Sequence, residues 1–227
     1  MTSTMAELKY PSTPPLFLVG TSGKGVRYLQ FLAQHLPADV PAAFFFLLHR
    51  VRASELQRPI LDMLKFHSQL DVCVPHTGQS IQPATIYLAP VDQHMTLVEQ
   101  RIVIADEPSD GKWRPSIDAL LISGAQSYQA NVVSVLLSGR LEDGVEGLRE
   151  TTRQGGITVA QSPEDAYDPI LPLNALLKDH PNYVLPLQDM PALFCELAGF
   201  SHFPHQKKVA EQAAQAAVRQ RKEVRES

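Results

Sequence analysis

The chain has 227 residues, of which 44% are hydrophobic and 19% charged, and its net charge is −4 at neutral pH. A chain of this length and apolar content can bury a full core, so disorder is excluded for most of it. The small acidic excess argues against a general nucleic-acid binder, which normally carries a basic excess.

The sequence offers no candidate for a membrane-spanning segment. The longest apolar run, AAFFFLL at Ala42–Leu48, has seven residues, whereas a bilayer needs ~20. The N-terminus lacks the charged and apolar regions of a secretory signal. Two cysteines far apart in sequence, Cys73 and Cys195, predict free thiols in a reducing compartment. We therefore expect a cytoplasmic protein without membrane insertion.

The chain begins with a segment that predicts little regular structure. Residues 1–15 carry three prolines among Ser and Thr and are typical of a flexible lead-in. From Leu16, the apolar run LFLV leads into GTSGKG, and VRYLQFLAQHL then places apolar residues at helical spacing. This order predicts a strand, a tight turn and a helix.

The same alternation continues along the chain. The run AAFFFLL is uniformly apolar, which predicts a central strand covered on both faces. Further elements are predicted in this order: a helix over Ser54–Phe66, a strand at ATIYLAP, a hairpin of MTLVEQ and RIVIAD, a helix over Ser116–Tyr128, a strand at VVSVLLSG, a helix over Val145–Arg153, a strand at ITVAQ and a helix over Ile170–Lys178. Repeated strand–helix–strand units with apolar strands predict an α/β fold: a mostly parallel β-sheet flanked by helices, with a small β-hairpin excursion.

The composition changes after Phe203, where Ala, Gln and charged residues dominate. Such a sequence favours helix but offers only a thin apolar stripe, so we predict a charged, Ala-rich helical tail over residues 201–227. Two interpretations stay open for it: a solvated helix, or a helix that docks a regulatory partner through its basic side chains, which are Lys207, Lys208, Arg219, Arg221, Lys222 and Arg225.

Potentially reactive side chains follow predicted strands, where ligands of parallel sheets gather. Ser22 lies on the glycine-containing turn VGTSGKG and resembles a nucleophile elbow, although Lys24 stands where the strict G-x-S-x-G motif requires glycine. A phosphate-binding loop is the competing interpretation of the same turn. It fails because Leu18 and Gly25 replace the first Gly and the Ser or Thr of the Walker pattern.

Two more strand ends carry residues that can complete an acyl-transfer site. His49 directly follows the FFFLL strand, and a histidine can accept a serine proton near neutral pH. Asp143 follows the VVSVLL strand and can orient an imidazole, although an acid near a helix start is more often a cap. Each residue alone is compatible with a purely structural role.

Several motifs together resemble a known family. In order, VGTSGKG, LLHR, YLAPVDQHM, WRPSIDALL, LLSGRLEDGVEGL and ITVAQ are similar to the catalytic domain of the CheB family, the protein-glutamate methylesterases of bacterial chemosensory systems. The resemblance covers about Leu16 to Leu197, and WRPSIDALL and YLAPVDQHM are its most specific parts. It implies a doubly wound α/β domain, which we place at residues 16–200.

The resemblance also implies an activity and its residues. Ser22 matches the nucleophile of the family's G-A-S-T-G-G, His49 the histidine of its Q-H-M-P and Asp143 the aspartate of its T-G-M-G-x-D-G. The family hydrolyses methyl esters of receptor glutamates, many members also deamidate receptor glutamines, and it needs no metal or organic cofactor. By the same analogy, the backbone N–H of Arg140 is a donor to the oxyanion.

The chain departs from the family pattern around this site. Gly23 replaces a Thr, Lys24 a Gly and Arg140 a Met, while Arg50-Val51 replaces Met-Pro. Lys24, Arg50 and Arg140 add three cations to the expected crevice, which would favour a carboxylate-bearing substrate and lower the pKa of the histidine. Asp92, His94 and Arg114 are interpreted as structural or lining residues.

The sequence therefore predicts a stand-alone methylesterase-like domain that acts on a methylated chemoreceptor or related sensory protein. The fifteen residues before Leu16 are too few for the family's usual receiver domain, so regulation is expected through a separate partner, localisation or the tail. Two alternatives remain: a weakly active or inactive adaptor that binds a signalling partner, and a serine hydrolase with another acyl substrate.

Overall fold

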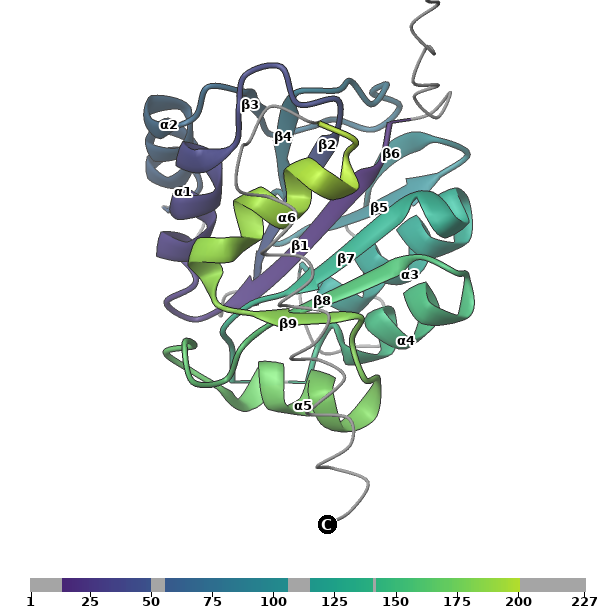
Figure 1. Ribbon diagram of the computed structural model, residues 1–227. Helices are drawn as coiled ribbons and strands as arrows, with labels where there is room; N and C mark the ends of the chain where they lie inside the picture. The colour runs from purple at the N-terminus through teal and green to yellow at the C-terminus, as the bar shows by residue number, and fades with distance from the viewer. Residues whose placement is uncertain (1–13, 50–55, 106–114, 141, 201–227) are drawn as a thin grey trace, which may run out of the picture.

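The computed structural model describes residues 14–49, 56–105, 115–140 and 142–200. Their centre is a seven-stranded parallel sheet (Figure 1) with the strand order β3-β4-β2-β1-β7-β8-β9. The strands of this sheet are β1 (Leu16–Ser22), β2 (Ala43–His49), β3 (Asp71–Cys73), β4 (Thr85–Leu88), β7 (Val132–Leu136), β8 (Ile157–Gln161) and β9 (Tyr183–Leu185).

Helices cover both faces of the sheet, as Figure 1 shows. They are α1 (Val26–His35), α2 (Gln57–His67), α3 (Ile117–Tyr128), α4 (Val145–Arg153), α5 (Ile170–Lys178) and α6 (Met190–Leu197), with short 3₁₀ turns at Gln129–Asn131 and Leu187–Asp189. A two-stranded antiparallel hairpin, β5 (His94–Val98) and β6 (Arg101–Ala105), forms a separate sheet. The structure confirms the predicted α/β fold and its hairpin excursion.

The sheet separates two apolar cores, and strand alternation assigns each side chain to one of them. Along β1, Phe17 and Val19 join the core with α1, α2 and α6, whereas Leu16 and Leu18 join the core with α3, α4, α5 and the hairpin. Successive side chains of a strand point to opposite faces, so a strand between two helical layers must be apolar throughout.

The aromatic run of β2 shows how the two cores are filled. Phe44 stacks on Phe17 at 5.0 Å between ring centroids, on the face where Phe194 of α6 also lies. The next residue, Phe45, stacks on Tyr87 of β4 at 4.9 Å on the other face. The uniform apolar pattern of AAFFFLL therefore reports burial on both sides, as predicted.

The order of the strands creates a topological switch point beside β1. The chain first builds β2, β4 and β3 on one side of β1 and later adds β7, β8 and β9 on the other. In open parallel sheets, ligands bind at the carboxyl ends of the strands where the order reverses. This principle directs attention to the end of β1, between β2 and β7.

Besides the short 3₁₀ turns, two described strands and one described α-helix were not predicted from the sequence: β3, β9 and α6. The two strands have three residues each and lie at the two edges of the sheet, which leaves little pattern to read. Helix α6 is apolar around most of its circumference, since five of its eight residues are buried, and so lacks the amphipathic period that marks a helix. Helix α2 begins at Gln57, and its predicted start at Ser54 lies outside the described residues. The predicted helical tail, residues 201–227, also lies outside them.

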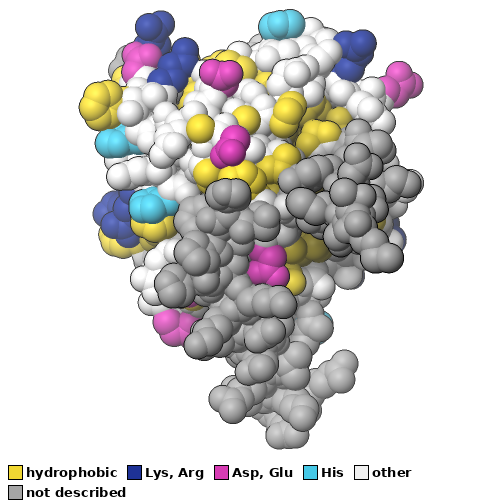
Figure 2. All heavy atoms as spheres, turned by 45° about the horizontal axis from the view of Figure 1, so that its top comes forward, with side chains coloured by type: hydrophobic (Ala, Val, Ile, Leu, Met, Phe, Trp, Pro, Cys, Tyr) yellow, Lys and Arg dark blue, Asp and Glu magenta, His cyan; other side chains and the backbone are white. Residues whose placement is uncertain are grey.

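Charged side chains of both signs are interspersed on the face shown in Figure 2.

The longest described helix, α3, has 12 residues, and none of the helices in the described ranges combines the length and apolarity that a membrane crossing requires.

Candidate active site

A serine lies at the carboxyl end of the central strand β1, where the turn to α1 begins. Ser22 is the last residue of β1, and its carbonyl accepts a hydrogen bond from the N–H of Gly25 at 3.1 Å. Gly23 within this turn has φ +61°, a left-handed conformation that glycine adopts without steric cost. The N–H groups of Tyr28 and Leu29 then donate to the carbonyl of Gly25 and begin α1. The predicted strand–turn–helix is thus present.

His49 lies directly beside Ser22. The two residues are register partners at the ends of the parallel strands β1 and β2, and neighbouring strands run about 4.8 Å apart. Register partners direct their side chains to the same face of a sheet, so the two groups share one side of the strand ends. Both are almost completely buried, with exposed fractions of 5% for Ser22 and 3% for His49.

Asp143 reaches the site from the loop after β7 and holds the start of helix α3. Its carboxylate accepts hydrogen bonds from the Ser116 hydroxyl at 2.9 Å, the Ile117 N–H at 2.8 Å and the Asp118 N–H at 3.0 Å. Ser116 in turn caps α3 by accepting from the Ala119 N–H. The sequence analysis noted that an acid near a helix start is often a cap. Asp143 does cap a helix, but it is the preceding helix α3, and Ser116 at the start of that helix lies 27 positions before Asp143.

The electrostatic surroundings of His49 connect it to Asp143. Burial lowers the pKa of His49 below its usual 6.5, and the negative charge of Asp143 raises it, with burial the larger influence. The direction of this shift agrees with the expectation. Among the described residues its largest cause is burial, and Arg50, one of the expected cations, lies outside them. A buried histidine with a lowered pKa is neutral at pH 7 and can accept a proton.

The loop after β7 carries a backbone donor onto the serine. The N–H of Arg140 donates to Ser22 Oγ at 3.2 Å. The N–H of Ser22 itself donates to the carbonyl of Ser138 at 3.2 Å. Gly139 lies between them, and a Cβ there would come within 2.7 Å of Ser22 Oγ. The backbone of residues 138–140 therefore contacts both the N–H and the Oγ of Ser22.

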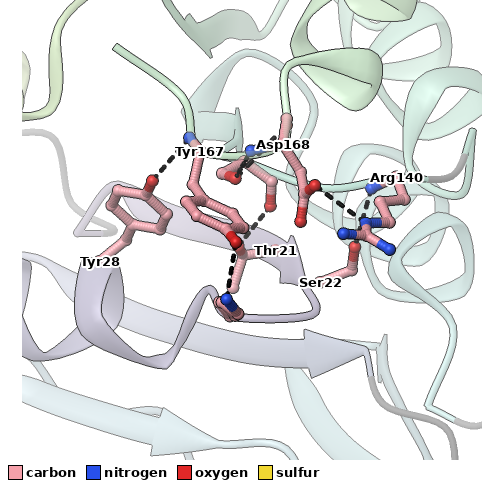
Figure 3. Close-up of polar contacts among 8 residues, drawn as sticks. Thr21, Ser22, Tyr28, Arg140, Tyr167 and Asp168 are labelled. Carbon is pink, nitrogen blue, oxygen red and sulfur yellow. Dashed lines mark hydrogen bonds and ion pairs between the residues drawn. The ribbon is translucent and has the colours of Figure 1, made fainter.

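The side chains of Arg140 and Lys24 have partners that the sequence did not reveal (Figure 3). Arg140 Nε donates to Asp168 Oδ1 at 2.9 Å. Lys24 Nζ donates to the hydroxyl of Tyr167 at 2.6 Å and lies 4.3 Å from its ring centroid, which lowers the pKa of Tyr167. Arg50, the third predicted cation, lies outside the described residues.

Tyr167 and Asp168 are the site residues that sequence reasoning missed. They follow β8 in the segment before α5, and the strand-end criterion that selected Ser22, His49 and Asp143 applies there too. The sequence signal existed in SPEDAYDP, but nothing in it indicated which of its three acids would turn toward Ser22.

A second carboxyl lies behind Asp143. Asp118 on α3 accepts from the N–H of Gly147 on α4 at 2.7 Å. Burial, with the charges of Asp143 and Glu146 adding to it, raises the pKa of Asp118 to about 6. The negative charge of Asp143 is thus one cause of the raised pKa of Asp118, after burial.

Of the three other polar residues named in the motifs, His94 has a backbone partner in the structure. His94 is buried, and its Nδ1 accepts from the N–H of Ser116 at 3.3 Å. Asp92 lies in the loop before β5 with φ +61°. Arg114 lies outside the described residues.

Comparisons with known proteins bear on this arrangement. The family model described as CheB methylesterase matches residues 17–194. A protein-glutamate methylesterase/protein-glutamine glutaminase of Photorhabdus laumondii is 34% identical over 154 residues, which are 66% of this chain and 43% of that protein. A protein of the same name from Chromohalobacter salexigens is 29% identical over 85% of this chain and 55% of its own length. The chain thus spans about half the length of these relatives.

A solved structure shares the fold. The CheB methylesterase catalytic domain of Thermotoga maritima superimposes with a TM-score of 0.74, covering 82% of this chain and 99% of that domain at 23% sequence identity.

Proposed function

Because the chain belongs to the CheB methylesterase family, we propose that it is a serine hydrolase that demethylates glutamyl methyl esters on a chemoreceptor or related sensory protein. In this proposal Ser22 is the nucleophile, His49 the general base and Asp143 the group that orients and stabilises the charged imidazole. Deamidation of glutamine side chains uses the same steps with ammonia as the leaving group. The names of the curated relatives include both activities.

One observation carries the proposal: the register pairing of Ser22 with His49 at the buried ends of adjacent strands. A serine hydroxyl has a very high pKa and attacks an ester only when a base removes its proton in the same step. His49 meets this need, because its lowered pKa leaves the imidazole neutral at pH 7.

The first half of the reaction acylates Ser22. His49 takes the hydroxyl proton while Oγ attacks the γ-carbonyl carbon of the ester, and the carbonyl oxygen becomes an oxyanion. The imidazolium then gives its proton to the departing methoxide, so methanol leaves and an acyl-serine remains. The carboxylate of Asp143 favours the imidazolium between these two transfers.

The N–H of Arg140 is the proposed donor to the oxyanion. It already contacts Ser22 Oγ at 3.2 Å, and the oxyanion forms on the carbon bonded to that atom. Loss of one such donor costs about 3 kcal/mol in other serine hydrolases. The N–H of Ser22 is engaged with Ser138, so this role falls to the loop after β7.

The second half of the reaction releases the product. A water molecule replaces methanol, His49 removes its proton, and the attack on the acyl-serine yields a glutamate carboxylate and free Ser22. Protein side chains, backbone N–H groups and water supply every step.

The rim of the site suits a substrate that carries carboxylates near the ester. Lys24 and Arg27 both lie over the ring of Tyr167, at 4.3 and 5.1 Å from its centroid. Arg140 is paired with Asp168, so among the described residues the cations that attract an acidic substrate are Lys24, which the sequence predicted, and Arg27, which it did not single out.

The proposal is tested with a fluorophosphonate probe and with methanol release from methylated receptor helices. Wild type is expected to label and to release methanol, whereas Ser22→Ala and His49→Ala lose both. Ser127→Ala on α3 and His35→Ala, whose ring stacks on Phe31, are the matched controls and keep both.

Labelling without methanol release indicates a serine hydrolase with another acyl substrate. A folded wild type that neither labels nor releases methanol contradicts the enzyme and leaves the adaptor interpretation. Folding is checked by the thermal unfolding transition of each variant.

A further inference from the structure

Resting on the function proposed above, we infer that Asp168 is a positioning residue: it fixes the loop of residues 138–140 so that the N–H of Arg140 points at the reacting centre. Asp168 lies before α5, on a segment separate from Ser22, His49 and Asp143. Figure 3 shows it facing Arg140 above Ser22.

The main chain of Asp168 holds the first two residues of the loop. Its N–H donates to Ser138 Oγ at 2.9 Å, and its carbonyl accepts from the N–H of Gly139 at 2.9 Å. The hydroxyl of Ser138 also lies 3.3 Å from that carbonyl. These contacts fix the path of the loop up to the peptide group before Arg140.

The side chain of Asp168 holds the third residue. Oδ1 accepts from Arg140 Nε at 2.9 Å, and this carboxylate is 14% exposed, whereas the arginine is 68% exposed. The other oxygen, Oδ2, lies 3.5 Å from where a Cβ of Gly23 would stand. The carboxylate therefore sits between the nucleophile turn and the loop that carries the donor.

The contacts of Arg140 explain what this arrangement achieves. The arginine is held at two points, by its N–H on Ser22 Oγ and by its guanidinium on Asp168. Exposed ion pairs add little to stability, so the value of this pair lies in orientation. A hydrogen-bond donor stabilises an oxyanion only when it is aimed at the developing charge before the reaction begins.

An electrostatic role for Asp168 predicts the opposite sign. A carboxylate near the oxyanion would disfavour its formation, and removal of the carboxylate would leave the positive guanidinium free to stabilise it. If charge were decisive, Asp168→Ala would accelerate acylation. A positioning role predicts that the same variant slows it.

The experiment compares acylation of Asp168→Ala and Asp168→Asn with wild type, using methanol release for kcat and KM and fluorophosphonate labelling for the nucleophile alone. Asp168→Ala is expected to lower kcat and the labelling rate about tenfold with KM within twofold. Asp168→Asn keeps an oxygen that accepts from Arg140 Nε and is expected to retain at least a third of the wild-type rate. Asp62→Ala, which removes the exposed partner of Arg58, is the matched control and keeps the wild-type values.

A double-mutant cycle shows whether Asp168 acts through Arg140. In an Arg140→Ala background, which retains the backbone N–H, Asp168→Ala is expected to change the labelling rate less than twofold. Full additivity of the two substitutions overturns the inference, because Asp168 would then act without Arg140.

The remaining outcomes are equally decisive. An unchanged or faster Asp168→Ala overturns the positioning role, and so does an Asp168→Asn as slow as Asp168→Ala. Failure of the proposed function looks different, since wild type itself would then lack labelling that depends on Ser22.

Discussion

Gly139 shows at the scale of one residue how little space surrounds the nucleophile. A Cβ at this position would lie 2.7 Å from Ser22 Oγ and 2.8 Å from Leu171 Cδ2. Both distances are shorter than carbon contacts allow, so any side chain here must move the serine, the leucine of α5 or the loop itself.

We predict that Gly139→Ala lowers the fluorophosphonate labelling rate at least a hundredfold, because the displaced Ser22 Oγ loses its alignment with the donor and the base. The overpacking should also reduce the free energy of unfolding by about 1–3 kcal/mol. Gly78→Ala is the control: it has φ +84° and no neighbour within 4 Å, so it carries backbone strain without touching Ser22. Equal labelling of both variants would contradict the prediction.

The second residue-scale prediction concerns the titration of His49. Burial lowers its pKa and the charge of Asp143 raises it, so Asp143→Asn removes the raising influence. We expect the imidazole of His49 to titrate below pH 6.5 in wild type and at a still lower pH in Asp143→Asn. The measurement is an NMR titration, with His49→Ala identifying the resonance. An upward shift in Asp143→Asn would disprove the electrostatic link.

The residues of the site differ in how far the sequence could predict them. Ser22 and His49 end strongly apolar strands and Asp143 lies in the loop after another, so their position at the carboxyl ends of the strands is a direct consequence of the pattern. Their catalytic roles stay predictions. Asp168 and Asp118 act through contacts with the distant residues Arg140 and Gly147. No local pattern encodes such contacts.

At the scale of elements, two carboxyls join helices α3 and α4. Asp118 on α3 accepts from Gly147 on α4, and Asp143, just before α4, accepts from the first residues of α3. Each helix therefore receives a hydrogen-bonding carboxyl from the chain segment of the other. The arrangement brings two acids close enough to influence each other, with Asp143 buried and Asp118 half-buried.

Because of Asp118, the protein is expected to lose stability as pH rises. A carboxyl with a lowered pKa would have the opposite effect. The pKa of Asp118 is raised to about 6, so the folded protein binds a proton more tightly than the unfolded chain does. The contribution of Asp118 is favourable below its unfolded pKa and is lost as pH rises toward 6. Between pH 4 and pH 7 this loss reaches at most about 3 kcal/mol of unfolding free energy.

We predict that Asp118→Asn, which keeps an acceptor for Gly147, becomes more stable relative to wild type as pH rises from 4 to 7. Urea unfolding of both proteins at several pH values measures the difference. Asp62→Asn on the exposed face of α2 is the control and should follow the wild-type curve. If wild type and Asp118→Asn stay parallel across this range, the raised pKa is wrong.

Elements were predicted correctly from the sequence where a helix has one apolar face or where a strand is apolar on both faces. Helices α4 and α5 begin and end at the predicted residues, because their buried positions recur at helical spacing. Helix α6 was missed because Met190, Leu193, Phe194 and Cys195 are buried around it, and such a run cannot be told from a buried strand by periodicity.

At the scale of the whole molecule, α6 closes one of the two cores. Phe194 is completely buried and packs its ring 4.8 Å from Phe17 and 6.5 Å from Phe44, measured between centroids. These partners belong to the two central strands β1 and β2. The last described helix thus packs against the first two strands of the sheet.

We predict that Phe194→Ala reduces the free energy of unfolding by about 3–5 kcal/mol, through lost burial and a residual cavity. Below its unfolding transition this variant should still label at Ser22. Phe66→Ala is the control, since that ring is 84% exposed and its loss should change stability by less than about 0.5 kcal/mol. Similar unfolding midpoints in urea for the two variants would contradict the role assigned to α6.

The overall architecture was predictable because the alternation of apolar strands and helices allows few layered arrangements. The sequence did not contain the strand order, which depends on how the helices and hairpin share the two faces of the sheet. The proposed domain limits at residues 16 and 200 stay a prediction, as does the helical tail.

The candidate site is assembled from distant parts of the chain, and this has a consequence for protein synthesis. The donor Arg140 and the acceptor Ser22 are 118 positions apart, and Asp168 lies still later. A growing chain on the ribosome therefore carries Ser22 long before the segments that would activate it have been made. Under the proposed function, reactivity of Ser22 then reports that the chain through Asp168 has been made and has folded, and fluorophosphonate labelling of stalled nascent chains of increasing length would time that event.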